Sequence, residues 1–130
     1  MGVVASLNNE EEIFDTGNDT IVVPRVMETV IGGRTLDTTD YKQAVIKAGS
    51  IVIKEDATGN HKPMPLDTEG INYGALPAGH TIVGAVISTV STKKPFVGIS
   101  TRGSVNEAAS PYPLTKAIKD ALPRINFFKE

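Results

Sequence analysis

The chain has 130 residues, a formal net charge of −2 and no cysteine. Its length suffices for one domain with a substantial core, and the absence of cysteine excludes disulfides and thiolate metal sites. The slightly acidic balance, with scattered lysines, argues against a protein that wraps nucleic acid, because such proteins carry a clustered basic face. Apolar runs fall far short of the roughly 20 residues that span a bilayer, and the first residues do not resemble a signal peptide. We therefore expect a soluble, unexported protein with no direct nucleic-acid partner and no membrane segment.

Residues 1–19 are predicted to form a flexible N-terminal arm, followed by one β-rich domain over residues 20–130. The arm is polar and acidic, so it has little apolar surface with which to offset the entropy of ordering. A terminus that carries a few apolar side chains can nevertheless add a strand to the exposed sheet edge of a partner. The arm residues expected to make this contact are Val3, Val4, Leu7, Ile13 and Phe14.

The first half of the domain is predicted to consist of short strands. Residues 20–31 are rich in β-branched side chains, with Pro24 indicating an edge strand or a break, and Gly32-Gly33 ending the run. Residues 44–54 indicate two short strands bent at Ala48-Gly49, since glycine tolerates positive φ. A turn over 55–60 then leads to residues 61–66, whose two prolines allow only a short edge segment.

The second half begins with a loop over residues 67–78 and continues with the strongest strand pattern of the chain, residues 81–90. Gly84 within it indicates a bulge or the close approach of another backbone. Alternation over 96–101 predicts a further strand, which an Arg102-Gly103 turn is expected to break, and residues 105–109 lead toward a helix.

The terminal helix is expected to start from Ser110 as N-cap, with Pro111 at its first position, and to stop at Pro123. One apolar stripe follows helical spacing along it: Leu114, Ala117, Ile118, Ala121 and Leu122. Residues 125–128 then form a last extended piece whose apolar end packs on the body or on a neighbour.

Candidate chemistry is sparse. Asp15-Thr16-Gly17 matches the tripeptide of retroviral-type aspartic proteases, which pair two such aspartates across a dimer, but the match is short and its expected downstream segment arrives too early. His61 and His80 are isolated, which favours surface histidines over metal ligands. No combination of acid, base and nucleophile emerges, so we predict a binding or structural module without catalytic residues, cofactor or metal. A protease that uses Asp15 is the less favoured alternative.

Several segments in order resemble the family of bacteriophage lambda-like head decoration proteins. They comprise residues 48–52, 60–64 and 82–86, the stretch 95–109 with its Arg-Gly and Val-Asn-Glu-Ala-Ala sequences, and the helix at 114–122. The resemblance implies a mainly β fold, of small barrel-like or sandwich-like form, with one short C-terminal helix and an N-terminal arm. It also implies a capsid cement protein that trimerises at local three-fold positions of the major capsid protein lattice and stabilises the expanded head.

The expected partners are therefore the major capsid protein, further copies of the chain and a head-fibre protein. The expected location is the outer capsid surface of the virion, after assembly in the bacterial cytoplasm. For the trimer interface we expect contributions from Arg102, Asn106, Glu107, Phe127 and Phe128. Alternatives within the same setting are the capsid-anchoring base of a head fibre and a tail or baseplate adaptor.

Overall fold

The computed structural model describes residues 19–39 and 41–129, and over these the protein is mainly β. The helical elements are α2 (Asp19–Val22), the 3-10 helix η1 (Glu107–Ala109) and α3 (Lys116–Ala121). The strands are β1 (Arg25–Thr29), β2 (Arg34–Thr35), β3 (Val45–Ile46), β4 (Ile51–Glu55), β5 (His61–Pro63), β6 (His80–Val86), β7 (Val90–Ser91), β8 (Phe96–Val97), β9 (Ile99–Asn106) and β10 (Ile125–Phe128). The predicted mainly β fold with a short C-terminal helix is confirmed.

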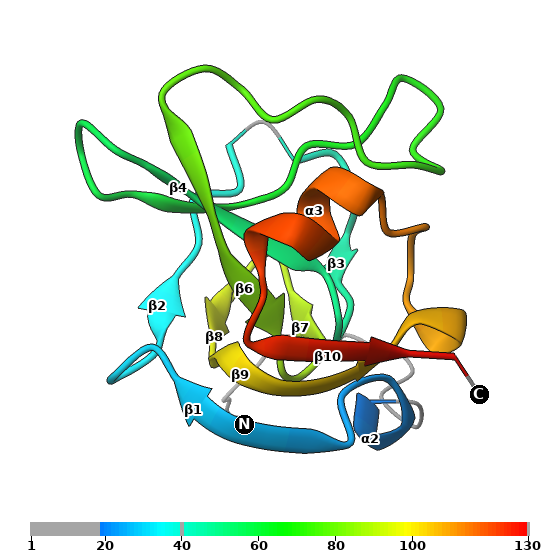
Figure 1. Cartoon of the computed structure of the whole chain (residues 1–130). Coiled ribbons are helices and arrows are strands. Elements are labelled where there is room, and N and C mark those ends of the chain that lie inside the picture. Colours follow the sequence, from blue (N-terminus) through cyan, green and yellow to red (C-terminus); the bar gives the residue numbers. More distant parts are fainter. Residues whose placement is uncertain (1–18, 40, 130) are drawn as a thin grey trace, which may run out of the picture.

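One six-stranded sheet organises the molecule. Its order is β1-β9-β6-β4-β5, and β10 joins it by pairing in parallel with β9. The other pairs in this sheet are antiparallel, as are the two-residue pairs β2–β8 and β3–β7. Figure 1 shows β1, β9 and β10 side by side across the lower part of the molecule, with β4 and β6 rising from them. The long strand β9 therefore pairs both with the first strand of the described residues, β1, and with the last, β10.

Residues 20–31, for which the sequence predicts an edge strand or a break at Pro24, form two separate elements. Residues 19–22 form the helix α2 instead, and only Arg25–Thr29 form the strand β1. Pro24 separates the two elements, so the alternative of a break at this residue is confirmed. Val22 and Val23 pack with Ala48 in a small buried cluster, which holds α2 against the body.

Strand β4 divides the core between its two faces. Ile51 and Ile53 belong to a cluster beneath α3, whereas Val52 belongs to a cluster on the opposite face. Alternate side chains of a strand point to opposite faces, so a continuous apolar run is what a strand buried on both sides requires. The cluster beneath α3 is completed by Met64, Tyr73, Ala85, Val105, Ile118, Leu122 and Ile125, and the opposite one by Leu36, Ile46, Val86, Val97 and Ile99.

Two glycines mark places where backbones approach too closely for a side chain. A Cβ on Gly84 would overlap the carbonyl oxygen of Ser100, and the register of β4 with β6 shifts beside it. Both alternatives predicted for Gly84 are thus correct. The predicted turn at Arg102-Gly103 is wrong, because β9 runs unbroken through Gly103, where a Cβ would overlap the carbonyl oxygen of Arg25. The chain breaks at Gly98 instead, between β8 and β9.

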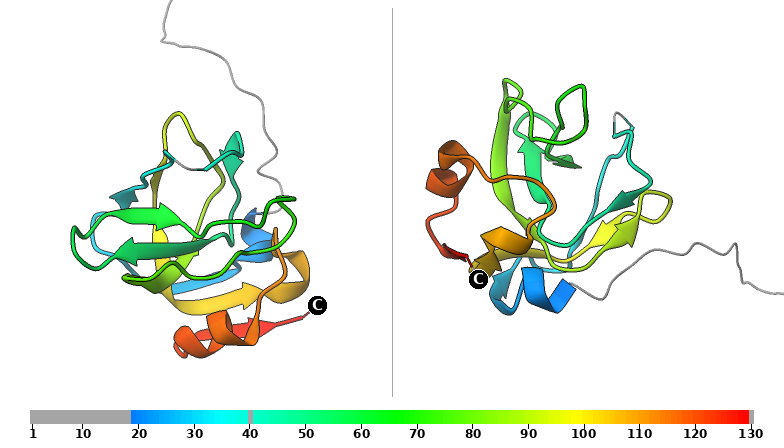
Figure 2. Two further views of the ribbon diagram at one scale, coloured as in Figure 1. Left: turned by 90° about the horizontal axis from the view of Figure 1, so that it is seen from above. Right: turned by 90° about the vertical axis from the view of Figure 1, so that its right-hand side faces the viewer.

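Helix α3 starts five residues later than predicted. Its N-cap is Thr115, whose side chain accepts a hydrogen bond from the amide of Ile118 at 3.3 Å, so the Ser110 cap is wrong. It ends before Pro123, as expected. Ile118 and Leu122 of the predicted stripe are buried and Leu114 is partly buried, whereas Ala117 and Ala121 are exposed. Figure 2 shows that α3 and β10 lie together on one side of the molecule.

Candidate interaction surfaces

The two histidines lie on neighbours of β4. In the strand register, His61 of β5 stands opposite Lys54, and His80 of β6 stands opposite Glu55. Lys62 Nζ lies 3.4 Å from His80 Nε2 and 3.2 Å from Glu55 Oε1. Burial, together with the positive charges of Arg34 and Lys54, lowers the pKa of His61 and favours its neutral form. The arrangement resembles a partly exposed polar network at the end of a sheet rather than a catalytic pair.

No group of three or more His, Cys, Asp or Glu side chains that could hold a metal ion is found within residues 19–39 and 41–129. Asp15, the aspartate of the protease hypothesis, lies outside the described residues, so that hypothesis stays untested.

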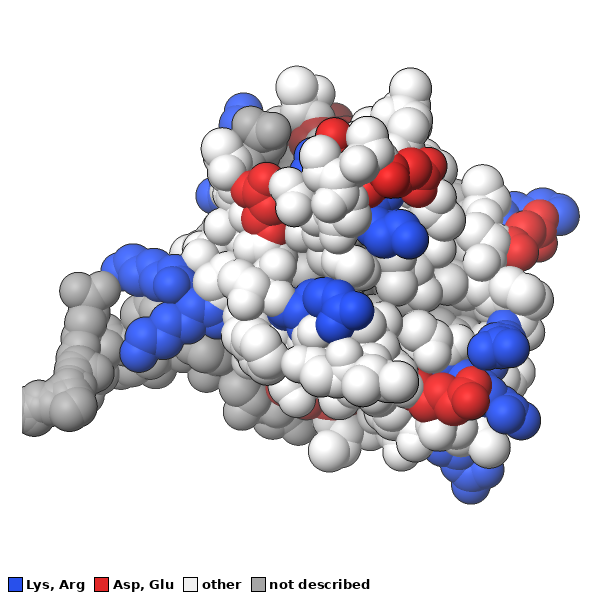
Figure 3. Space-filling model, turned by 90° about the vertical axis from the view of Figure 1, so that its left-hand side faces the viewer, with Lys and Arg blue, Asp and Glu red and all other residues white. Residues whose placement is uncertain are grey.

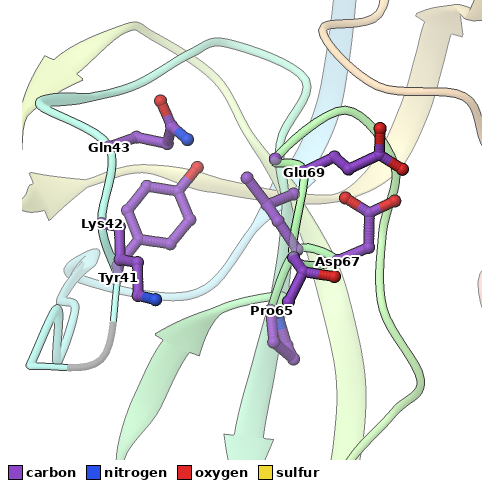
Figure 4. A pocket seen from close by; sticks show the side chains of 9 residues that line it. Tyr41, Lys42, Gln43, Pro65, Asp67 and Glu69 are labelled. Atoms are coloured by element: carbon purple, nitrogen blue, oxygen red, sulfur yellow. The ribbon is translucent and has the colours of Figure 1, made fainter.

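Two shallow clefts meet at Tyr41 and Pro65. The first, of about 240 Å³, lies between residues 41–43 and residues 65–70. Figure 4 shows Tyr41, Lys42 and Gln43 on one wall and Pro65, Asp67 and Glu69 on the other. The second, of about 300 Å³, extends from the same two residues past Asp37, Ile53, Lys62, Pro63, Pro77 and His80.

The carboxylate of Asp67, on the wall of the first cleft, organises its own loop. It accepts hydrogen bonds from the amides of Ile71 at 3.1 Å and Asn72 at 3.4 Å, and from the Asn72 side chain at 3.3 Å. Burial alone raises the pKa of Asp67, but these hydrogen bonds outweigh it and the net pKa is lowered. An ionised, locally bonded aspartate maintains the shape of the loop and is a poor general base.

Asp19, the last residue of the predicted arm, is hydrogen-bonded to the body. Asp19 Oδ1 accepts a hydrogen bond from Thr89 Oγ1 at 2.7 Å, and Asp19 Oδ2 accepts one from the Thr89 amide at 2.8 Å. The Thr89 hydroxyl in turn accepts from the buried amide of Ala48 at 3.0 Å. Asp19, which the sequence places in the arm, thus belongs to the folded body.

Among the residues that the structure describes, strand β1 has one edge without a partner strand. It pairs with β9 on one side, and all five of its residues are exposed. Met27 is 56% exposed, and Val26 is also exposed. An unpaired strand edge with apolar side chains is a template for pairing with another chain, which natural proteins usually cover or charge. We therefore treat the outer edge of β1 as a candidate interaction surface.

Arg102, the first of the predicted interface residues, is exposed on β9 opposite Glu28 of β1. Glu28 also pairs with Arg124 at 3.3 Å. Asn106 is buried, and its side chain accepts a hydrogen bond from the Ala108 amide at 3.1 Å, which caps η1. Asn106 therefore has an internal structural role, and Arg102 is the one whose side chain projects toward solvent.

The other three predicted interface residues also make contacts within the subunit. Glu107 is bonded to Lys119 at 3.0 Å and lies 3.9 Å from Lys129. Phe127 packs against the core cluster beneath α3, and Phe128 is partly buried on the same strand, β10. The trimer interface itself stays a prediction. The arm residues Val3, Val4, Leu7, Ile13 and Phe14 lie outside the described residues.

Sequence reasoning missed a further exposed surface at the β1–β2 bend. Ile31 is 91% exposed, and Phe96 on the neighbouring strand β8 is 61% exposed. Gly32-Gly33 was a signal for a bend, but nothing in the local sequence of Phe96 distinguishes an outward from an inward side chain. Figure 3 shows one face of the molecule, on which positive and negative side chains are interspersed and form no single large charged patch.

Comparisons with known proteins give no assignment. No family model matches the chain. No curated protein and no solved structure matches it either. In the part of the chain that the structure describes, none of the helices has the length and apolar character needed to cross a membrane.

Proposed function

We propose that this chain is a capsid decoration protein of the bacteriophage lambda-like type. In this proposal it trimerises on the outer surface of the major capsid protein lattice at local three-fold positions and stabilises the expanded head. One observation carries the proposal: the separate segments that resemble the decoration family converge on one structural unit. Residues 48–52 contain the start of β4, and residues 82–86 contain most of β6. Residues 60–64 contain β5, residues 95–109 contain β8 and β9, and residues 114–122 contain α3.

These elements are neighbours in space as well as in the resemblance. Strands β9, β6, β4 and β5 are adjacent in that order in the main sheet. Ile118 of α3 and Leu122, which caps its C-terminus, pack in the same cluster as Ile51 and Ile53 of β4. Five weak likenesses scattered over unrelated parts of a fold carry little weight. Here four of the segments contribute strands to one sheet and the fifth contributes to the core cluster beneath α3, which supports a common origin.

The surface chemistry fits a protein that acts by adhesion. A decoration protein requires extended contacts with its own copies and with the shell, and many weak contacts on a lattice become tight by avidity. The open edge of β1 offers such a contact surface. The arm, with Val3, Val4, Leu7, Ile13 and Phe14, is proposed to contact the major capsid protein by strand addition. The chain is proposed to have no catalytic activity.

The decisive experiment is co-sedimentation of the full chain with expanded shells of its own phage from which minor proteins have been stripped. We expect saturation near one copy per major capsid subunit, and a trimer by analytical ultracentrifugation. Deletion of residues 1–18 is expected to weaken binding without abolishing the trimer. Saturation only at a few copies per hexamer or at vertices would replace the proposal with the base of a head fibre. Absence of binding to any shell would refute it.

A further inference from the structure

Arginine side chains gather on the solvent-facing side of strands β1 and β9. Residues paired across neighbouring strands carry their side chains on the same face of a sheet, and so do residues two apart along one strand. Arg25 of β1 is paired with Ser104 of β9, and Glu28 of β1 is paired with Arg102 of β9. Since Arg102 and Ser104 are two residues apart, all four side chains share one face.

Strand β10 extends this face beyond the other edge of β9 (Figure 1). Asn126 of β10 is paired with Ser104 and therefore shares its face. Arg124, which precedes β10, accepts a hydrogen bond from the Gly103 amide through its carbonyl oxygen at 3.4 Å. Its Nη1 donates to Glu28 Oε1 at 3.3 Å, so this side chain also lies over β9 on the side of Glu28. We call this surface the arginine face and define it as Arg25, Glu28, Arg102, Ser104, Arg124 and Asn126.

The arginine face is open to solvent and has an excess of positive charge. Its residues are exposed, apart from the half-buried Ser104. Three guanidinium groups accompany one carboxylate, that of Glu28, and the exposed ion pair of Glu28 with Arg124 neutralises only one of them. Neither Arg25 nor Arg102 forms an ion pair with another residue among 19–39 and 41–129.

The type of residue on this face points to the recognition of carboxylates. The chain contains four arginines and nine lysines. Three of the four arginines lie on the arginine face, whereas the lysines are scattered over β4, β5, α3 and the loops. A guanidinium presents a planar fork of donors that matches the two oxygens of a carboxylate, and an ammonium does not. Like charges this close repel one another, so the cluster is destabilising until an anion neutralises it.

The spacing of the arginines fits an extended chain. Residues two apart in a strand are separated by about 6.7 Å, and neighbouring strands by about 4.8 Å. Arg25 lies one strand across and two residues along from Arg102, which separates their Cα atoms by about 8 Å. Carboxylates at alternate positions of an extended peptide are also about 6.7 Å apart, and the long arginine side chains accommodate the difference. Ser104 and Asn126 supply hydrogen-bonding groups between them.

The surroundings favour an acidic protein segment over nucleic acid or a second copy of the same face. Sites for single-stranded nucleic acid stack bases on aromatic rings along a basic groove, whereas Ser104 and Asn126 stand between the arginines here. The whole chain also has a net charge of −2. The arginine face of a second copy carries the same excess of positive charge, and like charges brought together across an interface are unfavourable.

We propose that the arginine face binds an extended acidic segment of another protein, with glutamate or aspartate at alternate positions. Arg25 and Arg102 each receive one carboxylate, while Arg124 stays paired with Glu28. Under this assignment Arg102 serves an acidic partner and not the trimer contact expected from the family resemblance. The inference does not depend on the proposed function, because it requires neither a shell nor a trimer.

The test is an NMR titration of the 15N-labelled full chain with a capped Glu-Ser-Glu-Ser-Glu peptide at about 20 mM salt, where screening is weak. We expect saturable chemical-shift changes concentrated at residues 25–28, 102–104 and 124–126. The matched uncharged peptide, Gln-Ser-Gln-Ser-Gln, is expected to cause none. Changes centred elsewhere, or no changes with the acidic peptide, would overturn the proposal. A thymidine pentanucleotide that binds the same amides more tightly would assign the face to nucleic acid and would also overturn it.

Substitutions on the arginine face test its charges one step further. The double variant Arg25→Gln, Arg102→Gln is expected to weaken peptide binding about five-fold or more, because two ion pairs are lost. Glu28→Gln removes the competing carboxylate and is expected to strengthen binding about two-fold. The matched control Lys42→Gln, Lys94→Gln removes the same charge from exposed loops and is expected to change the affinity by less than about two-fold. Equal losses in the control and in the arginine variant would refute a specific site.

Two further measurements separate the guanidinium fork from charge alone and from self-association. Arg25→Lys with Arg102→Lys keeps the charge and is expected to restore only part of the affinity, so full restoration would contradict recognition by the fork. The sedimentation coefficient of the free Arg25→Gln, Arg102→Gln variant is expected to equal that of the unmodified chain. A smaller value would show that the arginine face joins copies of the chain and would overturn the proposal.

Discussion

Replacement of Thr89 by valine is predicted to destabilise the protein by about 3 kcal/mol. The hydroxyl that is lost donates to the Asp19 carboxylate at 2.7 Å and accepts from the Ala48 amide at 3.0 Å. A hydrogen bond to a charged group contributes about 2 kcal/mol, and a buried amide left without an acceptor costs about 1 kcal/mol or more. Valine keeps the branched shape and the backbone amide that bonds Asp19, so the change isolates the hydroxyl.

The assay is urea unfolding followed by far-UV circular dichroism at fixed protein concentration, because the chain contains no tryptophan. A lower midpoint with an unchanged m value is expected. Thr92→Val is the matched control, since the Thr92 hydroxyl donates only to the exposed Ala44 carbonyl at 2.9 Å; its effect is expected to stay below about 1 kcal/mol. If Thr89→Val lowers the free energy of unfolding by less than about 0.5 kcal/mol, the stabilising role assigned to the Thr89 hydroxyl between Asp19 and Ala48 is refuted.

Three further predictions concern the core and the sheet end. Gly84→Ala is expected to cost about 3 kcal/mol or more in urea unfolding, because its Cβ would overlap the carbonyl oxygen of Ser100 and the strands would have to separate. Ile118→Ala should cost about 2–5 kcal/mol by the same assay, while Ser at the exposed neighbour Ala117 should change stability by less than about 0.5 kcal/mol. His61 should titrate below about 6.5 by NMR, because burial and two nearby cations lower its pKa. Its contribution to stability is therefore undiminished above about pH 6.5 and decreases as the pH falls through the lowered pKa, and a His61 pKa above 6.5 would contradict this account.

The parts of the fold that the sequence predicted correctly depend on local periodicity. The alternation of Ile51, Val52 and Ile53 between two core clusters follows from the strand repeat, and burial of Ile118 and Leu122 follows from the helix repeat. Such patterns require only that one face meets apolar partners. They are readable without knowledge of what those partners are.

The failures depend on distant contacts. Residues 19–22 have β-branched composition, yet they form a helix whose first residue is held by Thr89, seventy positions away. Residues 110–114 contain a plausible cap, but Tyr112 packs edge-on against Tyr73 with ring centroids 5.3 Å apart, and the helix begins only after Thr115. Neither the Asp19–Thr89 contact nor the Tyr73–Tyr112 contact can be predicted from the local sequence.

The candidate surfaces were harder to predict than the fold. A glycine such as Gly103 has the same local signature in a turn as in a strand crowded by another backbone. Likewise, the outward side chain of Phe96 and the open edge of β1 are set by which strands pair with which. Exposure is a property of the assembled sheet, so the sequence alone gave no indication that Ile31 and Phe96 are exposed.

The anchoring of Asp19 has a mechanical consequence. A force that pulls on Asp19 from its N-terminal side loads the two hydrogen bonds between the Asp19 carboxylate and Thr89 before it loads β1. Those bonds connect the load to the segment between β6 and β7 and, through Ala48, to the bend before β4. Tension is therefore shared among central strands and does not peel the exposed edge strand from β9 one hydrogen bond at a time.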